Sequence, residues 1–268
     1  MVISTAPFSD GAVLRNANLD DFMGKYSVDG CFATRDVMAR AIYTEILEGR
    51  GTADAGVYLD LGHIPADTLM ERYRTLYDYL GGRRTIQVAP AAHFMMGGVS
   101  IDEKCRTSVP GLLAAGEVAG GIHGANRLAG NALTEAAVFG SIAGREAVRA
   151  SRELGKIPVV QDTEEIRNIT SVKYLFKTGA VSADELGRIR TGLQKTVEES
   201  MYVIRTLAGL EKAMADLDVY AEQLAAHPVV NYPEFLESSQ LRLMLSTARI
   251  IIRSGLSRKE SIGAHYCL

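Results

Sequence analysis

Apolar positions in the first ninety residues recur with both strand-like and helical spacing. Short apolar runs at 12–14 and 57–59 favour strands, and the spacing of apolar residues predicts helices over 35–48 and 65–79. Short strands mixed with amphipathic helices are typical of a body that packs helices against a small sheet. We therefore expect an α+β fold, a mixed α/β body, in this part of the chain.

Residues 91 to about 155 hold the glycine-rich sequence. An apolar run over 111–117 predicts a short buried strand, and small residues at close-packing intervals accompany a helical pattern over 134–152. The loop 115–133 between them combines several glycines with one glutamate and one arginine. Backbone without Cβ atoms can approach a ligand closely, and a loop that opens into a helix N-terminus suits an anion.

Residues 156 to 268 show helical periodicity almost throughout. The pattern predicts helices over 163–176, 182–207, 216–226 and 233–254. Successive amphipathic helices of this kind bury their apolar faces against one another. The whole chain is thus predicted to be a mixed α/β body followed by a C-terminal helical bundle.

Composition narrows the classes of protein that fit. With 268 residues and 47% hydrophobic content, the chain can bury a sizeable core. The net charge of −3 and the lack of a basic cluster with aromatics argue against a nucleic-acid partner. No apolar run is long enough for a membrane span, and no signal peptide is recognisable, so a cytoplasmic location is expected. The 3 cysteines lie far apart, which argues against a disulfide framework or a cysteine metal site.

The glycine-rich loop supplies the first candidate chemistry. The carboxylate of Glu117 could accept hydrogen bonds from a sugar-type diol, and an arginine on a tight loop, Arg127, suits a carboxylate clamp. The amides of Ala132 and Leu133 at the helix start could point at a ligand oxygen. The alternatives are a solvated acid for Glu117 and an arginine that satisfies loop carbonyls for Arg127.

Two further residues carry candidate chemistry. His93 lies in the apolar segment 90–99, where we expect it to be partly buried and able to hydrogen-bond a substrate oxygen. Its alternative is a core histidine with satisfied hydrogen bonds. Arg35 follows a potential cap, Thr34, in the first turn of a helix, where the dipole disfavours a cation. A cation in that position hints at function, although pairing with Asp36 would also explain it.

Together these segments resemble the flavoprotein subunit of the succinate dehydrogenase and fumarate reductase family, which also contains L-aspartate oxidase. The matching segments follow the same order as in the family and together extend over nearly the whole chain. Their combination points to the family more specifically than any single segment does. It is carried by Asn16–Tyr26, Thr34–Ile42, Tyr58–Leu61, His93–Gly98, Gly116–Leu133 and Glu260–Tyr266.

The resemblance implies three domains and a chemistry. Residues 1–90 look like a capping domain that closes over the substrate, 91–155 like the C-terminal segment of a Rossmann-like FAD-binding domain, and 156–268 like a helical C-terminal domain. In such enzymes FAD exchanges a hydride with a dicarboxylate such as fumarate or succinate. The family also implies an iron–sulfur electron-transfer partner, and membrane association through partner subunits.

Residue roles follow from the same resemblance. It implies Arg35 as the proton donor, and His93 and Arg127 as ligands of the substrate carboxylates. It implies Glu117 as a contact of the ribityl chain of FAD. The family's amides at the pyrimidine edge of the flavin correspond to Asn131, Ala132 and Leu133.

The sequence departs from the family's pattern in three places. The family begins with a strand, a G-x-G-x-x-G turn and a helix for the FAD pyrophosphate, and these are not found here. The chain therefore resembles a C-terminal half, either a truncated product, a split subunit or a fragment, which we expect to need an N-terminal FAD-binding half for normal affinity. Thr5 and Phe8 stand where the family has its relay glutamate and arginine, and Ile262 stands where the tail has arginine.

The leading hypothesis is an FAD-dependent oxidoreductase of the fumarate reductase type, with no metal ligands of its own. L-Aspartate oxidase or a related FAD enzyme is the alternative within the family. A different class of alternative is a non-catalytic fragment or an interaction subunit of a split flavoprotein, which the altered relay and the missing pyrophosphate motif favour.

Overall fold

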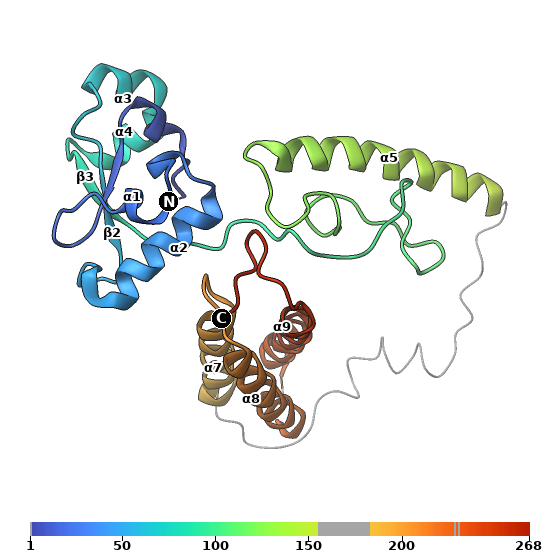
Figure 1. The fold of residues 1–268 in the computed structure, drawn as a ribbon. Coiled ribbons are helices and arrows are strands. Elements are labelled where there is room, and N and C mark those ends of the chain that lie inside the picture. Colours follow the sequence, from blue (N-terminus) through green and yellow to red (C-terminus); the bar gives the residue numbers. More distant parts are fainter. Residues whose placement is uncertain (1, 155–182, 228, 230) are drawn as a thin grey trace. The chain divides into compact units, whose positions relative to one another are not determined.

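The computed structural model describes residues 2–154, 183–227, 229 and 231–268 (Figure 1). Two compact units form within it. Unit 1 comprises Met1–Gly98 and Glu117–Ala132, and unit 2 comprises Val99–Gly116 and Leu133–Leu268. A small sheet with short helices in unit 1 and long helices in unit 2 confirm the expected α+β class with a C-terminal helical bundle.

A three-stranded antiparallel sheet forms the centre of unit 1. Its strands, in sheet order, are β1 (Val13–Arg15), β2 (Val57–Asp60) and β3 (Thr85–Val88). The register pairs Leu14 with Leu59 and Leu59 with Ile86, so three buried apolar side chains share one face. Strands were expected at 12–14 and 57–59 and are confirmed, whereas β3 was not anticipated.

Short helices supply the rest of unit 1. They are η1 (Ala6–Asp10), α1 (Met23–Tyr26), η2 (Gly30–Phe32), α2 (Arg35–Glu45), the π-helical turn η3 (Ile46–Arg50), α3 (Ala66–Arg72) and α4 (Arg74–Leu80). A single helix over 65–79 is wrong, because Tyr73 leaves the helical region at φ −130° and ψ 42°. Its hydroxyl instead donates to Asp10 Oδ2 at 2.5 Å.

The core of unit 1 joins the buried face of the sheet to these helices. Its fully buried large side chains come from β1, α1, α3, α4 and the connecting loops. They are Leu14, Phe22, Met23, Leu61, Ile64, Leu69 and Leu80. This packing fixes the position of α2, whose Met38, Ala41 and Ile42 contribute its own buried face.

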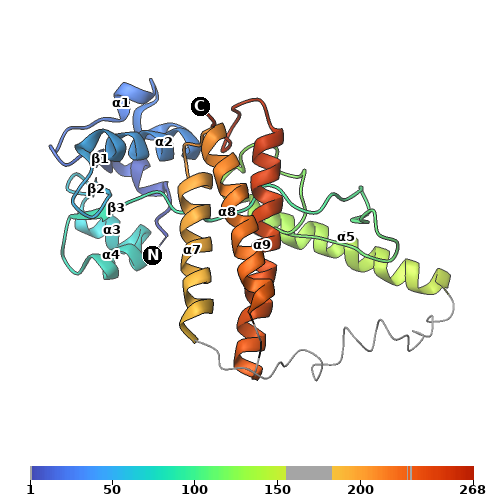
Figure 2. The same cartoon turned by 90° about the horizontal axis from the view of Figure 1, so that it is seen from below.

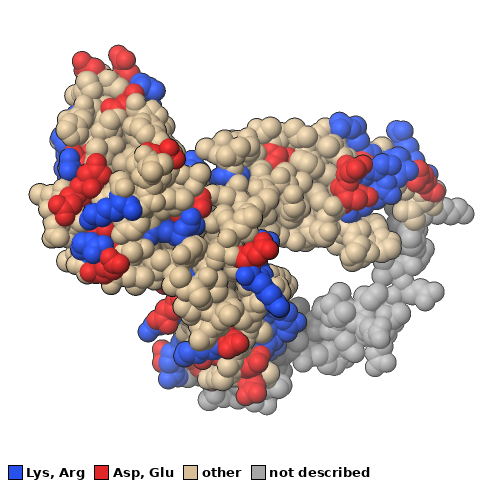
Figure 3. Space-filling view, in the orientation of Figure 1, with Lys and Arg blue, Asp and Glu red and all other residues tan. Residues whose placement is uncertain are grey.

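The long helix α5 (Asn131–Leu154) begins three residues before the predicted helix over 134–152. The strand predicted over 111–117 is wrong. That run forms an isolated bridge between Arg106 and Leu113, and its backbone bonds the Cys105 carbonyl and the Thr107 amide, but it pairs with no strand among the described residues. Figure 3 shows the charged side chains of α5 gathered toward its C-terminal end, whereas the first half is largely uncharged.

Three long helices of unit 2 pack side by side (Figure 2). They are α7 (Ala183–Met201), α8 (Leu207–Ala226) and α9 (Tyr232–Ser257). One helix over 182–207 is wrong, because the chain turns after Met201 and Thr206 caps α8 by accepting from the Gly209 amide at 3.0 Å. The predicted helix over 216–226 accordingly begins nine residues earlier, at Leu207.

Helix α9 spans the predicted 233–254 and extends to Ser257. The predicted helix over 163–176 and the first residue of the predicted helix over 182–207 lie outside the described residues. No helix in the described ranges has the length and apolar character needed to cross a bilayer.

Candidate functional site

The glycine-rich loop folds against the segment that carries His93, and two glycines permit the approach. A Cβ on Gly98 would overlap the carbonyl oxygen of Val118, and one on Gly120 would lie 2.9 Å from the Gly98 nitrogen. The Met95 amide also donates to Glu117 Oε1 at 2.9 Å. The loop and the segment therefore hold a fixed relation within unit 1.

Arg127 is the buried cation of this arrangement, with 9% of its surface exposed. Its guanidinium carbon lies 4.5 Å from the centre of the Phe94 ring, and its Nη1 donates to the Leu128 carbonyl at 3.1 Å. Its Nε is buried without a hydrogen-bond partner, and Arg127 forms no ion pair with any described residue. A buried, incompletely satisfied guanidinium is poised to bind an anionic ligand.

His93 does not have the environment expected from its apolar neighbours. It is exposed rather than partly buried, because residues 91–93 run without an element packed over them. The next residue, Phe94, places its ring between two groups of the loop, the Arg127 guanidinium and the His123 ring at 5.3 Å. Phe94 and His123 were not among the sequence-predicted site residues. The position of Phe94 directly after His93, a candidate site residue, was the signal in the sequence that could have identified it.

The first turn of α2 carries Arg35, which is half-buried and forms no ion pair within the described residues. Pairing between Arg35 and Asp36 is wrong. Asp36 Oδ2 accepts from Arg40 Nη2 at 2.9 Å, and its Oδ1 accepts from Asn126 Nδ2 at 2.7 Å. Asn126 directly precedes Arg127, so the end of the helix that bears Arg35 is bonded to the loop that bears Arg127.

The electrostatics of Asp36 favour its charged form. Burial raises the pKa of this carboxyl, but hydrogen bonds from Thr34 and Arg40 outweigh burial and hold the pKa below its usual value. Thr34 occupies the N-cap position of α2 without a side-chain bond to the helix backbone. Its hydroxyl thus serves Asp36 rather than the first turn.

The residues predicted to face a cofactor lie on the exposed side of the loop. Glu117 is exposed, and only its Oε1 has a partner, the Met95 amide. Asn131 opens α5 and is exposed, Ala132 is half-buried, and Leu133 is 84% exposed. The Asn131 amide donates to the Leu128 carbonyl at 3.4 Å. The first-turn amides of Ala132 and Leu133 lack acceptors within the helix, so these two positions offer donors to a ligand.

A second group of charges surrounds Glu45 at the end of α2, whose side chain is buried and fully paired. Glu45 accepts from Arg50 Nε and Nη2 at 2.7 Å each, from Tyr26 Oη at 2.7 Å and from Asn16 Nδ2 at 2.9 Å. The Arg50 hydrogen bonds outweigh burial and lower the pKa of Glu45 to about 2. Burial and the bond to Glu45 raise the pKa of Tyr26 to about 12. Sequence reasoning missed this group, because its members lie far apart in the chain.

Thr5, Phe8 and Ile262, which the sequence set apart from the family's pattern, have no polar side-chain contact with the described residues that suggests a chemical role. Phe8 is 8% exposed and packs in the core of unit 1, and Thr5 precedes η1 without a side-chain cap bond. Ile262 is 46% exposed in the C-terminal tail. None of these side chains supplies a titratable group.

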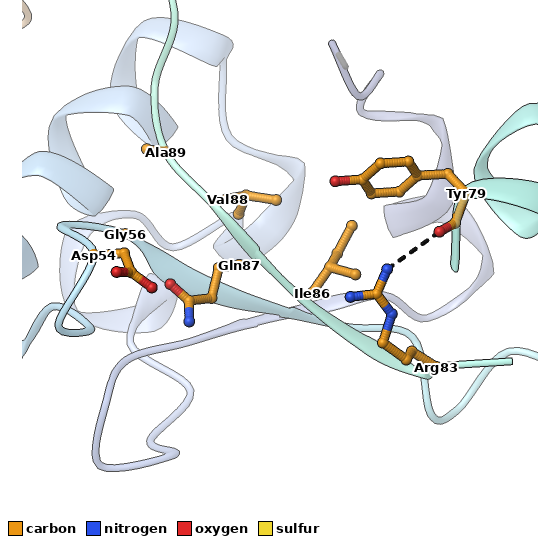
Figure 4. A pocket seen from close by; sticks show the side chains of 8 residues that line it. All are labelled: Asp54, Gly56, Tyr79, Arg83, Ile86, Gln87, Val88 and Ala89. Atoms are coloured by element: carbon orange, nitrogen blue, oxygen red, sulfur yellow. Dashed lines mark hydrogen bonds between the residues drawn. The ribbon is translucent and has the colours of Figure 1, made fainter. Parts of the chain in front are cut away.

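A separate hollow of about 420 Å³ lies beside β3 (Figure 4). Its wall includes Tyr79 and Arg83, whose Nη2 donates to the Tyr79 carbonyl at 3.3 Å. No sequence-predicted site residue lines it. Among the described residues, no group of histidine, cysteine, aspartate or glutamate is arranged to hold a metal ion.

Comparison with protein families gives two matches along the chain. Residues 2–133 match the FAD binding domain family, and residues 190–267 match the fumarate reductase flavoprotein C-terminal family. The first match includes the segments that carry Arg35, His93, Glu117 and Arg127.

Individual relatives agree with these families. A fumarate reductase (CoM/CoB) chain of Methanothermobacter marburgensis is 40% identical over 99% of this chain and 50% of its own length. An L-aspartate oxidase of Caulobacter vibrioides is 34% identical over 96% of this chain and 44% of its own. The chain spans about half the length of the curated relatives it matches.

Solved structures match over the same extent. An E. coli quinol fumarate reductase superposes with a TM-score of 0.90 at 26% identity, over 100% of this chain and 50% of that one. A structure of Mycobacterium smegmatis Sdh1 matches with a TM-score of 0.78 at 28% identity, over 100% of this chain and 46% of that one.

Proposed function

Since the chain belongs to the flavoprotein family of succinate dehydrogenase and fumarate reductase, a family of FAD-dependent oxidoreductases, we propose that it carries the substrate side of a site for hydride exchange between FAD and a dicarboxylate. The observation that carries this proposal is Arg127. A buried guanidinium with an unpartnered Nε and no described carboxylate partner calls for a bound anion.

Arg127 binds one substrate carboxylate, because a guanidinium can donate two parallel hydrogen bonds to a carboxylate. Phe94 keeps the guanidinium in place by stacking. His93, one residue before Phe94 and exposed, is available to bond the second carboxylate or a carbonyl oxygen.

The loop also fits the cofactor that the family uses. The free Oε2 of Glu117 can accept a hydrogen bond from a hydroxyl of a ribityl chain. The first-turn amides of Ala132 and Leu133, which follow Asn131 at the start of α5, can donate to the carbonyl edge of a flavin. The positive end of α5 favours negative charge at that edge. When bound, FAD supplies the two-electron hydride chemistry that no side chain here can perform.

Arg35 acts as the proton donor to the substrate. It stands at the N-terminus of α2, half-buried and without an ion pair to any described residue, so its donors remain available to a substrate carbon. An arginine that gives up a proton in each turnover needs a path by which that proton is restored. Phe8 and Thr5 cannot serve as that path, so solvent or another acid has to restore the proton.

We assign residues 1–90 to a capping domain, 91–155 to the C-terminal segment of the FAD-binding domain and 156–268 to the helical domain. The assembled flavoprotein would then join this chain to an N-terminal FAD-binding half and pass electrons to an iron–sulfur subunit. We expect a cytoplasmic location, with any membrane association supplied by partner subunits.

A second candidate reaction uses the same residues. L-Aspartate oxidases are among the relatives at 34% identity, and L-aspartate is a dicarboxylate that Arg127 and His93 could bind equally. A non-catalytic protein is the other alternative. It is favoured by Thr5 and Phe8, which stand where the family has its relay residues, and it predicts that no substrate turns over.

The test is to co-express the chain with the polypeptide encoded directly upstream and purify the complex, here called the assembled flavoprotein. Flavin absorbance and fumarate reduction by a reduced dye should both appear, and oxidation of L-aspartate is assayed in parallel. Arg35→Lys should keep the flavin and lose fumarate reduction. Turnover by Arg35→Lys at the unsubstituted rate would remove the assignment of Arg35, and flavin without any turnover would favour the non-catalytic alternative.

A further inference from the structure

One hydrogen bond links the two ends of the proposed substrate site. Asn126 Nδ2 donates to Asp36 Oδ1 at 2.7 Å, although the residues are 90 positions apart in the chain. Each partner adjoins an arginine of the site, since Arg35 precedes Asp36 and Arg127 follows Asn126. The bond therefore constrains the separation between the two arginines.

The acceptor of this bond is held firmly. Asp36 accepts from Arg40 Nη2 at 2.9 Å through its other oxygen, and only 10% of its side chain is exposed. An aspartate in the first turn of a helix is also favoured by the helix dipole. Its lowered pKa keeps it ionised near neutral pH, so the bond from Asn126 is charge-assisted and stronger than one between neutral groups.

The donor side is equally constrained. Arg127, next to Asn126, is buried, stacked on Phe94 and bonded to the Leu128 carbonyl. The loop also packs closely on the preceding segment where Gly120 meets Gly98. Asn126 thus extends from a rigid loop, and its side-chain amide donates the hydrogen bond that joins this loop to α2.

We propose that Asp36 and Asn126 form an interlock that sets the spacing of Arg35 and Arg127 for a bound dicarboxylate, which makes them positioning residues. The proposal rests on the proposed function of the two arginines. Neither interlock residue needs to touch the substrate. Because a displacement of about 1 Å can slow a reaction on the order of a hundredfold, loss of the interlock should reduce turnover even when the fold survives.

The experiment introduces a second carboxylate and then exchanges the donor and the acceptor in the assembled flavoprotein. Asn126→Asp sets two carboxylates against each other and should lower kcat for fumarate about tenfold, with flavin content unchanged. The double variant Asp36→Asn/Asn126→Asp exchanges donor and acceptor, and should be several-fold faster than Asn126→Asp alone. A double variant no faster than Asn126→Asp would overturn the interlock.

Asp78→Asn is the matched control. It breaks the pair between Arg74 and Asp78, an i,i+4 aspartate–arginine pair in the same unit that resembles the Asp36–Arg40 pair but has no bond to the loop. Turnover by this variant should match that of the unsubstituted protein. An equal loss of kcat in Asp78→Asn would mean that general destabilisation, rather than positioning, explains the Asn126→Asp result.

Hydrogen–deuterium exchange separates failure of the interlock from failure of the proposed function. In Asn126→Asp, amides of the first turn of α2 and of the loop 117–131 should both exchange faster, whether or not any dicarboxylate turns over. An unsubstituted protein that is inactive on every dicarboxylate would reject the proposed function while this coupled exchange still supports the interlock. Faster exchange in only one segment, or in neither, would reject the interlock.

Discussion

Two arginines of unit 1, Arg50 and Arg127, differ in what surrounds their guanidinium groups. Arg50 bonds both oxygens of the buried Glu45 and also pairs with Glu48, while 30% of its side chain reaches solvent. Arg127 is more deeply buried, yet its guanidinium stacks on the Phe94 ring and donates to the Leu128 carbonyl, and its Nε has no hydrogen-bond partner.

The difference separates a charge that stabilises the fold from one that we propose binds a ligand. Breaking a buried ion pair leaves an uncompensated charge and destabilises a protein, so Arg50 and Glu45 belong to the architecture of unit 1. A buried charge without a partner is itself destabilising, and such groups mark binding or catalytic sites. The two arginines should therefore respond in opposite ways to substitution.

Arg127→Gln should produce the largest effect, on catalysis. Removing the guanidinium leaves a substrate carboxylate unpaired, which costs about 4 kcal/mol and corresponds to about a thousandfold loss of kcat/KM for fumarate. The free energy of unfolding of the chain should be unchanged or higher, because an unsatisfied buried charge disappears. Steady-state kinetics and urea denaturation measure the two quantities. Arg74→Gln, on exposed α4, is the control that should alter neither.

Glu45→Ala should show the reverse pattern. It leaves Arg50 without its main partner and removes the acceptor of Tyr26 and Asn16, so the free energy of unfolding should fall by about 3 kcal/mol. Urea denaturation of the full chain, followed by circular dichroism, measures this loss. A fall of less than about 1 kcal/mol, the size of one ordinary hydrogen bond, would show that the Glu45 network adds little to the fold and would erase the contrast with Arg127.

Acid should weaken the Glu45 network in a defined window. The folded pKa of about 2 lies below the ordinary value of 4.5, so the stabilisation is complete above pH 4.5 and is lost as the pH falls toward 2. Between pH 7 and pH 3 this corresponds to about 2 kcal/mol. The stability gap between the unsubstituted chain and Glu45→Gln should narrow by that amount on acidification. A gap that stays constant with pH would contradict the assignment to Glu45.

The smallest effect is expected in alkali. The pKa of Tyr26 rises from 10.0 to about 12 on folding, so its stabilisation is complete below pH 10 and declines as the pH rises through 12. By pH 11 the unsubstituted chain should lose about 1 kcal/mol that Tyr26→Phe does not lose. Urea denaturation at pH 8 and pH 11 tests this, and parallel losses in both proteins would exclude Tyr26 as the cause.

Several features of the fold and site could be predicted from the sequence because their signals are local. Helical spacing located α2 and α9, and short apolar runs located β1 and β2. The glycines of the loop predicted a close approach to a ligand, and the structure shows that one of them, Gly120, lies against the Gly98 backbone within unit 1. Arg127 was recognisable as a candidate because small residues surround it in the sequence.

Other features had no local signal. The apolar run at 111–117 has the composition of a strand, but a strand needs a partner that periodicity does not reveal. Tyr73 interrupts a helical pattern because its hydroxyl bonds Asp10, far away in the chain. His93 was expected to be partly buried from its apolar neighbours, whereas burial depends on what packs over a segment.

By itself the sequence determined which residues could carry chemistry and, through its resemblance to known flavoproteins, the family to which they belong. Only the tertiary structure decided how those residues are used. It paired Asp36 with Arg40 and Asn126 rather than with Arg35, and it enclosed Glu45 in a complete set of donors. It left the Nε of Arg127 without an acceptor. The physical reason is that periodicity reports contacts over one or two helical turns. Satisfaction of a buried charge depends on groups brought together from distant parts of the chain.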